Sequence, residues 1–198
     1  MSDLATAEEL TDDARSGGRL APFVALGVAI AMIGLVVLFI GADPNAPVNE
    51  AQSPLIGRPA PEAVGELDDG APFDLSRRKG SFVVLNFFQS SCIPCIAEHP
   101  ELVDFVEQQA GLGLDGAEFY SVVTGDTREN VDAFFEEEGG DWPAIYSDGD
   151  QITVSFGVAQ VPETWIIDPG GVVQARFQGE VTADLLSITI QQIREAIR

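Results

Sequence analysis

The apolar residues of the chain fall into short blocks that predict alternating strands and helices. The block at 82–88 is β-branched and aromatic almost throughout, which predicts a strand with both faces buried. Beyond residue 95, apolar residues recur at helical spacing to about residue 109, with carboxylates between them, and predict an amphipathic helix. Residues 118–124 predict a second buried strand, and 126–140 predict a helix that ends at a glycine pair.

The rest of this part of the chain continues the alternation. Residues 182–198 predict a last helix, with Leu185, Ile188, Ile193 and Ile197 on its apolar side. An α/β fold class follows from the order strand, helix, strand, helix, strand, strand, helix. The remaining predicted elements are a hairpin at 63–75 that turns at Asp68-Asp69-Gly70, a strand at 142–146, a helix at 151–156, and an antiparallel hairpin made of 164–167 and 172–177.

Residues 20–42 carry no charge and are rich in Leu, Ile, Val, Ala and Gly. At ~1.5 Å per helical residue, this stretch is long enough to cross a hydrocarbon core of ~30 Å. We interpret it as an uncleaved transmembrane signal anchor. A cleaved signal peptide is the main alternative, but no convincing small-x-small cleavage pattern precedes Asp43. A buried core helix is the other alternative, and such helices are rarely apolar all round for so long.

Basic residues set the expected orientation of this anchor. Arg15 and Arg19 stand on its N-terminal side, and no basic residue lies between 43 and 57. The positive-inside rule then places residues 1–19 in the cytoplasm as a polar tail and the rest of the chain outside. Residues 43–55 contain three prolines and predict a linker to a domain at 56–198. The expected location is the cell membrane, crossed once.

Composition narrows the range of partners. The 198 residues carry a net charge of −22 and a single lysine, Lys79. Nucleic-acid binding requires a basic surface, so this charge argues against it. The acidic surface fits either a salt-rich habitat or plain solubility. The length suffices for one domain with a sizeable core and extensions.

Both cysteines of the chain, Cys92 and Cys95, lie between the strand predicted at 82–88 and the helix that follows it. Cys92 falls near the helix N-terminus, where unpaired N–H groups and the helix dipole stabilise a thiolate. Cys95 lies one turn further along and is expected to be more buried. The C-x-x-C spacing therefore predicts an exposed attacking sulfur at Cys92 and a shielded resolving sulfur at Cys95.

The motif C-x-x-C-x-x-E-H-P at 92–100 is accompanied by G-V-x-x-V-P-E-T-W-I-I-D at 157–168. Together they resemble the membrane-anchored TlpA/ResA/CcmG group of extracytoplasmic thiol-disulfide oxidoreductases, several of which serve cytochrome c maturation. The resemblance covers roughly 56–198 and implies a thioredoxin-like fold, with a central mixed sheet flanked by helices. One departure is Ser91, because the group usually has Trp directly before the first cysteine. It concerns the packing beside the sulfur rather than the redox chemistry.

The resemblance implies roles for residues that follow the dithiol. Glu98 is expected to lie partly buried below it and to move protons for Cys95; the alternative is one more solvated helix carboxylate. A carboxylate beside Cys95 is expected to raise the pKa of both groups, because two negative charges repel. His99 is expected to have a capping or surface role rather than a catalytic one.

The resemblance also implies a substrate-binding loop formed by Val161, Pro162 and Glu163. The Val161–Pro162 peptide bond is expected to be cis, since the thioredoxin fold uses this loop to present its backbone to a bound substrate strand. Glu163 is expected to contact partners. A plain turn proline is the alternative for Pro162.

Other uses of a C-x-x-C pair fit the sequence less well. A zinc site normally has four ligands, and the chain has one histidine, His99, and no further cysteine. A structural disulfide across so short a loop constrains little of the unfolded chain. A copper site of the thioredoxin-like chaperone type needs a distant histidine that the sequence lacks. We therefore expect no metal, and no cofactor besides the redox-active Cys92–Cys95 pair.

The expected function is thiol-disulfide exchange outside the membrane. By resemblance, the substrates are protein disulfides such as that of the C-x-x-C-H segment of apocytochrome c, reduced before haem attaches, and the electron donor is a membrane thiol carrier. A general reductase or oxidant for secreted proteins is an alternative with the same chemistry. A non-enzymatic metal-binding or redox-sensing module is an alternative of another class. The direction of exchange stays open, because the potential depends on small differences in thiolate stabilisation.

Overall fold

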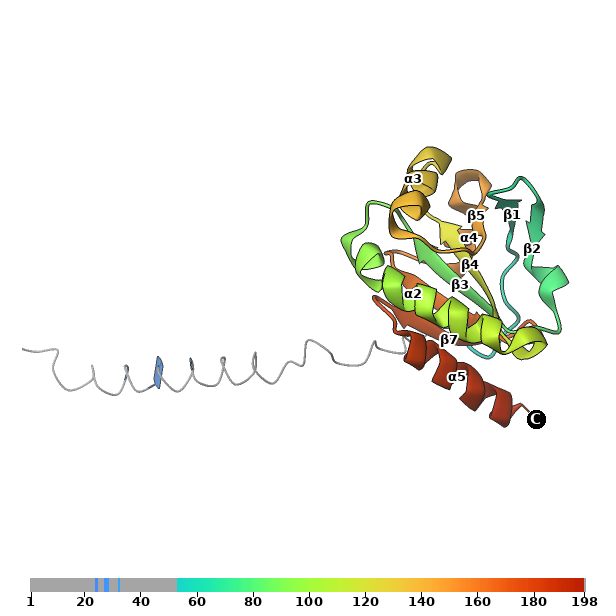
Figure 1. The fold of residues 1–198 in the computed structure, drawn as a ribbon. Coiled ribbons are helices and arrows are strands. Elements are labelled where there is room, and N and C mark those ends of the chain that lie inside the picture. Colours follow the sequence, from blue (N-terminus) through green and yellow to red (C-terminus); the bar gives the residue numbers. More distant parts are fainter. Residues whose placement is uncertain (1–23, 25–26, 29–31, 33–52, 198) are drawn as a thin grey trace, which may run out of the picture. The chain divides into compact units, whose positions relative to one another are not determined.

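The structure is a computed structural model, and it describes residues 24, 27–28, 32 and 53–197. Residues 53–197 form a seven-stranded sheet with helices on both faces (Figure 1). The strands are β1 (Val64–Leu67), β2 (Pro72–Asp74), β3 (Val83–Phe88), β4 (Glu118–Val123), β5 (Ala144–Tyr146), β6 (Glu163–Ile167) and β7 (Val173–Gln178). The helices are α2 (Ile93–Gly111), α3 (Arg128–Glu138), α4 (Gln151–Phe156) and α5 (Ala183–Ala196).

The sheet is mixed, with strand order β2-β1-β5-β4-β3-β6-β7. Strands β3, β4 and β5 run parallel, so α2 and α3 serve as their crossover connections. On the other side of β3, strand β6 runs antiparallel and continues into β7. The carboxyl end of β3 therefore meets the start of β6, and this junction holds the site described below.

Strand β3 lies inside the sheet, between β4 and β6, and all six of its residues are buried. Alternate side chains enter two different cores, as the period of a strand requires. Leu85 and Phe87 face a core shared with α4 and the segment before β1. Val84 faces a core shared with α2 and α5. The continuous apolar block at 82–88 therefore correctly predicted a strand that is buried on both faces.

Within residues 53–197 the predicted elements are confirmed, but the predicted apolar side of the last helix is wrong in two positions. Ile188 and Ile197 are 56% and 49% exposed. The buried residues of α5 are Ala183, Leu186 and Ile190, with half-buried neighbours at Leu185 and Ile193. Because the helix turns by ~100° per residue, Ile188 lies far around the axis from Leu186.

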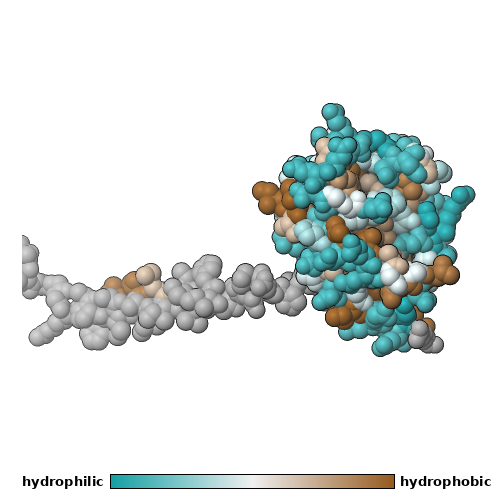
Figure 2. Space-filling view, viewed as in Figure 1, coloured by the Kyte–Doolittle hydropathy of each residue, from teal (hydrophilic) through white to brown (hydrophobic). Residues whose placement is uncertain are grey.

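Strand β7 forms one edge of the sheet, and residues 57–60 pair with its first residue, Val173, and with the turn before it. The Gly57 N–H donates to the Val173 carbonyl at 2.8 Å, and the Val173 N–H donates to the Arg58 carbonyl at 2.9 Å. The Ala60 N–H donates to the Gly171 carbonyl at 2.9 Å. Figure 2 shows that the visible face of the described domain is mostly hydrophilic, with small hydrophobic patches, in keeping with the net charge of −22.

The predicted tail at 1–19 lies outside the described residues, as does nearly all of the predicted anchor at 20–42 and of the linker at 43–55. Residues 24, 27, 28 and 32 of the anchor are described, and they are helical. Within the described residues, no helix combines the length and the apolar character that a membrane crossing requires.

Candidate active site

The C-x-x-C pair lies where β3 ends and α2 begins. Cys92 is the N-cap residue of α2, and its Sγ accepts a hydrogen bond from the Cys95 N–H at 3.2 Å. Pro94 fits the first turn, where a missing N–H costs nothing. The sulfur of Cys92 therefore occupies a position that normally attracts negative charge.

Cys92 and Cys95 form a disulfide, with their Cα atoms 5.2 Å apart. Cys95 is only 2% exposed, whereas Cys92 is partly exposed. Ser91 and Ile93 flank Cys92 and are both exposed, Ile93 at 80%. An approaching thiolate can therefore reach the sulfur of Cys92 more readily than that of Cys95.

A loop far along the sequence faces this sulfur. The Val161–Pro162 peptide bond is cis, as predicted, and the carbonyl oxygen of Val161 lies 3.6 Å from Sγ of Cys92. The Pro162 carbonyl accepts a hydrogen bond from the Gly179 N–H at 2.9 Å, which ties the loop to the end of β7. The structure thus brings together Cys92, Val161 and Pro162 from the set predicted to form the site.

The loop that precedes Cys92 is held by Asp126, a residue that sequence analysis did not single out for the site. Oδ2 of Asp126 accepts hydrogen bonds from the Ser90 N–H at 2.7 Å and from the Ser90 hydroxyl at 2.6 Å. Partial burial by itself raises the pKa of Asp126, but hydrogen bonds from Ser90, Asn130 and Thr127 outweigh it and hold the pKa below its usual value. This carboxylate therefore holds the chain segment that leads into Cys92.

Glu98 is 1% exposed and lies one turn beyond Cys95 on α2. Its Oε1 accepts from the Asn86 amide at 2.8 Å, and its Oε2 accepts from the Val181 N–H at 3.1 Å. Burial raises the pKa of Glu98 to about 8, while the two hydrogen bonds oppose this rise. The predicted rise is present in the disulfide state, so its main cause is loss of solvation rather than charge on Cys95.

Two polar residues that sequence analysis missed complete this buried network. Asn86 lies in the middle of β3, pairs with Thr164 of β6, and donates to the Thr164 hydroxyl at 3.1 Å. Both residues are almost fully buried. A lone asparagine inside an otherwise apolar strand was the available signal, since a buried amide needs hydrogen-bonding partners.

A model of the Redoxin family matches residues 55–196. The chain belongs to the redoxin family. The thiol:disulfide interchange protein HelX of Rhodobacter capsulatus is 34% identical over 154 residues, which cover 76% of this redoxin and 81% of HelX. The thiol-disulfide oxidoreductase ResA of Geobacillus thermodenitrificans is 30% identical over 142 residues, which cover 70% of this redoxin and 78% of ResA.

Solved structures show the fold. The thioredoxin domain of a thiol-disulfide oxidoreductase from Bacteroides vulgatus matches with a TM-score of 0.61 at 24% identity, and the match covers 71% of this redoxin and 99% of that chain. The predicted thioredoxin-like fold is therefore confirmed. Together with the relatives and the family match, this shows that the redoxin is a thiol-disulfide oxidoreductase, with its disulfide in the C-x-x-C arrangement.

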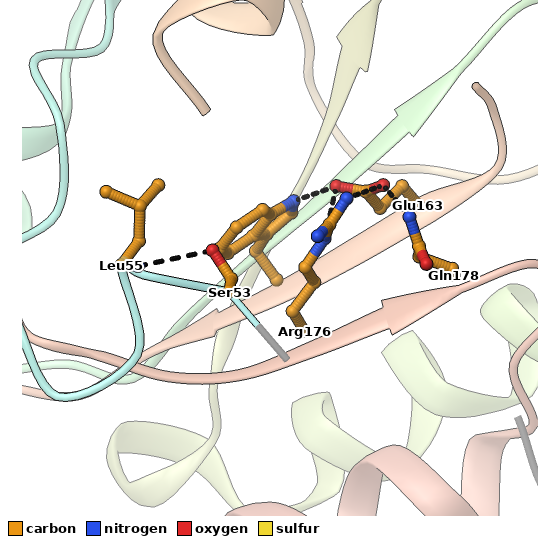
Figure 3. A network of polar contacts seen from close by, with 6 residues as sticks. Ser53, Leu55, Glu163, Arg176 and Gln178 are labelled. Carbon is orange, nitrogen blue, oxygen red and sulfur yellow. Dashed lines mark hydrogen bonds and ion pairs between the residues drawn. The ribbon is translucent and has the colours of Figure 1, made fainter. Parts of the chain in front are cut away.

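Glu163 of this redoxin departs from its expected role. Its side chain is buried and bound within the domain, where Oε1 accepts from the Trp165 indole at 2.7 Å (Figure 3 shows the cluster). The Arg176 guanidinium binds both carboxylate oxygens, at 3.0 and 2.8 Å. Alternation along β6 points Glu163 and Thr164 to opposite faces of the sheet. A direct contact between the Glu163 side chain and a partner therefore disagrees with the structure.

The expected surface role of His99 is wrong, whereas a capping role is confirmed at Gly139, the C-cap residue of α3. The histidine is buried beside Phe134, Phe135 and Trp142, with ring centroids 4.8, 5.7 and 5.1 Å away. Its Nε2 lies 2.9 Å from the Gly139 carbonyl oxygen and donates to it in the neutral ring. Burial lowers the pKa of His99, so the ring is a neutral packing residue between α2 and the end of α3.

Proposed function

We propose that this redoxin reduces disulfides of extracytoplasmic proteins, with Cys92 as the attacking residue and Cys95 as the resolving residue. The observation that carries the proposal is the unequal placement of the two sulfurs. Cys92 is partly exposed at the N-cap of α2 and faces the Val161 carbonyl, whereas Cys95 is buried one turn before a buried carboxyl group. This arrangement suits an entering nucleophile and a shielded second thiol.

The exchange transfers two electrons to the substrate. The Cys92 thiolate attacks one sulfur of the substrate disulfide, forms a mixed disulfide and releases the other substrate sulfur as a thiolate. Cys95 then loses its proton and attacks Sγ of Cys92. The Cys92–Cys95 disulfide forms, the second substrate thiolate leaves, and both substrate thiolates take protons from solvent.

Glu98 serves as the proton carrier of this cycle. With a pKa of about 8 it holds a proton at pH 7 when the disulfide is formed. When a donor thiolate breaks the disulfide at Cys92, Cys95 leaves as a thiolate and takes this proton, directly or through a water. A second donor thiolate then releases Cys92 and forms the donor disulfide. The Glu98 carboxylate takes the proton back when Cys95 attacks again.

The proposed substrate class is the disulfide of the C-x-x-C-H segment of apocytochrome c, reduced before haem attachment, with a membrane thiol carrier as electron donor. The resemblance of the 92–100 and 157–168 motifs to the TlpA/ResA/CcmG group supports this choice. The proposed location is the cell membrane, with residues 20–42 as a single-pass anchor and the redoxin domain outside.

The test uses the full-length protein and an oxidised C-x-x-C-H peptide. We expect Cys95→Ser to accumulate a mixed disulfide with the peptide and Cys92→Ser to form none. A mixed disulfide only in Cys92→Ser would reverse the two roles. A dithiol potential near that of strong oxidants would contradict the direction of exchange. A peptide with the histidine replaced by alanine is the matched control, and equal rates on both peptides would favour a general reductase.

A further inference from the structure

The side-chain amide of Asn86 is used at one end only. Its Nδ2 group donates to Oε1 of Glu98 at 2.8 Å and to the Thr164 hydroxyl at 3.1 Å. Its Oδ1 is buried and has no hydrogen-bonding partner among the described residues. A buried acceptor without a donor is destabilising, so only the two hydrogen bonds of Nδ2 hold the amide in its present orientation.

The orientation in the structure is the one that suits ionised Glu98, the form that the oxidised domain reaches above a pH of about 8. A carboxylate accepts at both oxygens, and here each oxygen faces a donor, the Asn86 amide or the Val181 N–H. A carboxylic acid must donate from one oxygen. The backbone N–H of Val181 can never accept, so the proton belongs on Oε1, and the group that faces Oε1 must then offer an acceptor.

Asn86 can make this exchange and Val181 cannot. A half turn about the last side-chain bond brings Oδ1 to the place of Nδ2, because the two ends of an amide have nearly the same shape. Oδ1 would then accept from the Glu98 acid. The Thr164 hydroxyl rotates freely, so it can accept from Nδ2 in one state and donate to Oδ1 in the other.

We propose that Asn86 is a positioning residue for Glu98, and that its amide turns by half when Glu98 gains or loses its proton. The proposal rests on the proposed role of Glu98 as proton carrier and adds the partner that makes both forms of the carboxyl group acceptable in a dry interior. Thr164 follows the turn, while the Val181 N–H holds Oε2 in place throughout. The carboxyl group can therefore change its protonation state without moving away from Cys95.

Among the described residues, none of the titratable groups around Glu98 forms a hydrogen bond with its Oε1. On its own helix the titratable neighbours are Cys95, His99 and Glu101, and Glu101 accepts from the Ala183 N–H at 3.0 Å. Glu180, which precedes Val181, raises the pKa of Glu98 further. Glu163 of β6 points to the other face of the sheet, where it binds Arg176, and Asp184 of α5 is exposed.

Nuclear magnetic resonance of the oxidised full-length protein tests the turn without a substitution at Asn86. We expect the side-chain amide resonances of Asn86 to shift with pH, with the same midpoint as the carboxyl carbon of Glu98. The matched control is Gln109, a buried amide on α2 that donates to Ser187 at 3.2 Å, whose resonances should stay constant. Constant Asn86 resonances while Glu98 titrates would overturn the proposal.

Kinetics provide the second test. Asn86→Leu keeps a similar volume but offers neither donor nor acceptor, so we expect dithiol oxidation to slow by about tenfold or more and to lose its dependence on the protonation of Glu98. An unchanged pH profile in Asn86→Leu would contradict the proposal. Failure of the proton-carrier role is separate, because it shows as an unchanged pH profile in Glu98→Gln.

Discussion

Cys92 and Val161 are 69 residues apart in the sequence, yet the sulfur of Cys92 lies 3.6 Å from the carbonyl oxygen of Val161. The contact joins the start of α2 to the loop before β6. A substrate backbone that pairs with this loop would therefore be held directly beside the attacking sulfur. The cysteine pair and the cis-proline loop thus share one junction at the end of β3.

The first prediction concerns pH and Glu98. Its pKa is about 8 in the folded domain and near 4.5 without burial, so an unfolded chain loses this proton first as pH rises. The stability contributed by the neutral carboxyl group is present below pH 4.5 and is lost as pH rises through about 8. We expect the free energy of unfolding to fall across this window by at most ~1.4 kcal/mol per pH unit.

Denaturant titrations of the full-length protein at several pH values measure this effect. Glu98→Gln should remove the slope, and Glu107→Gln, at an exposed position of α2, should retain it. Burial lowers the pKa of His99 from its usual value of 6.5. Below pH 6.5 this histidine therefore makes stability rise with pH, which opposes the effect of Glu98. The informative range for Glu98 is pH 7 to 8. A slope that persists there in Glu98→Gln would show that another group titrates.

The second prediction concerns Arg176. Its guanidinium neutralises the buried carboxylate of Glu163 at 2.8 Å. Arg176→Met should lower the free energy of unfolding by ~3–5 kcal/mol, because a buried charge is left without a partner. The double variant Glu163→Gln with Arg176→Met should recover part of this loss, which a double-mutant cycle measures.

The control for Arg176 is Arg77, whose ion pair with Asp74 is largely exposed. Arg77→Met should change the free energy of unfolding by less than ~1 kcal/mol. Equal losses in Arg77→Met and Arg176→Met would mean that burial of Glu163 does not decide the effect.

The third prediction concerns Asp126, which holds Ser90 by two hydrogen bonds. Asp126→Ala should cost ~1 kcal/mol of stability, because two half-buried donors of Ser90 lose their acceptor. The lowered pKa of Asp126 means that its contribution is present above its usual pKa of 3.8 and is lost as pH falls through its folded value. Asp132→Ala, at an exposed position of α3, is the control, and a similar loss there would count against the Ser90 contact.

Much of the site follows from local sequence. The apolar block of β3, the helical spacing after Cys95 and the short C-x-x-C motif are patterns within about one element, so the strand, the helix and the relative burial of the two sulfurs could be predicted. The identity of Pro162 as a cis residue came from resemblance, and the structure confirms it.

What could not be predicted depends on contacts between distant segments. Glu98 accepts a hydrogen bond from the Val181 N–H, 83 residues further along the chain. This donor is a backbone group, so no pattern of side chains could predict it. The orientation of Glu163 follows from the pairing of β6 with β7, where Trp165 lies opposite Arg176. Ile188 was misplaced because several apolar stripes can be drawn on α5, and only packing against α2 selects one.

The segment 57–60 has a practical consequence for where a shortened chain may begin. By pairing with Val173 and with the turn before it, the segment occupies N–H and C=O groups that would otherwise be open where this edge of the sheet begins. An open edge is a template for pairing with a second molecule. A truncation starting at residue 61 would therefore lengthen the open edge and favour self-association, whereas one starting at residue 53 keeps the start of β7 covered.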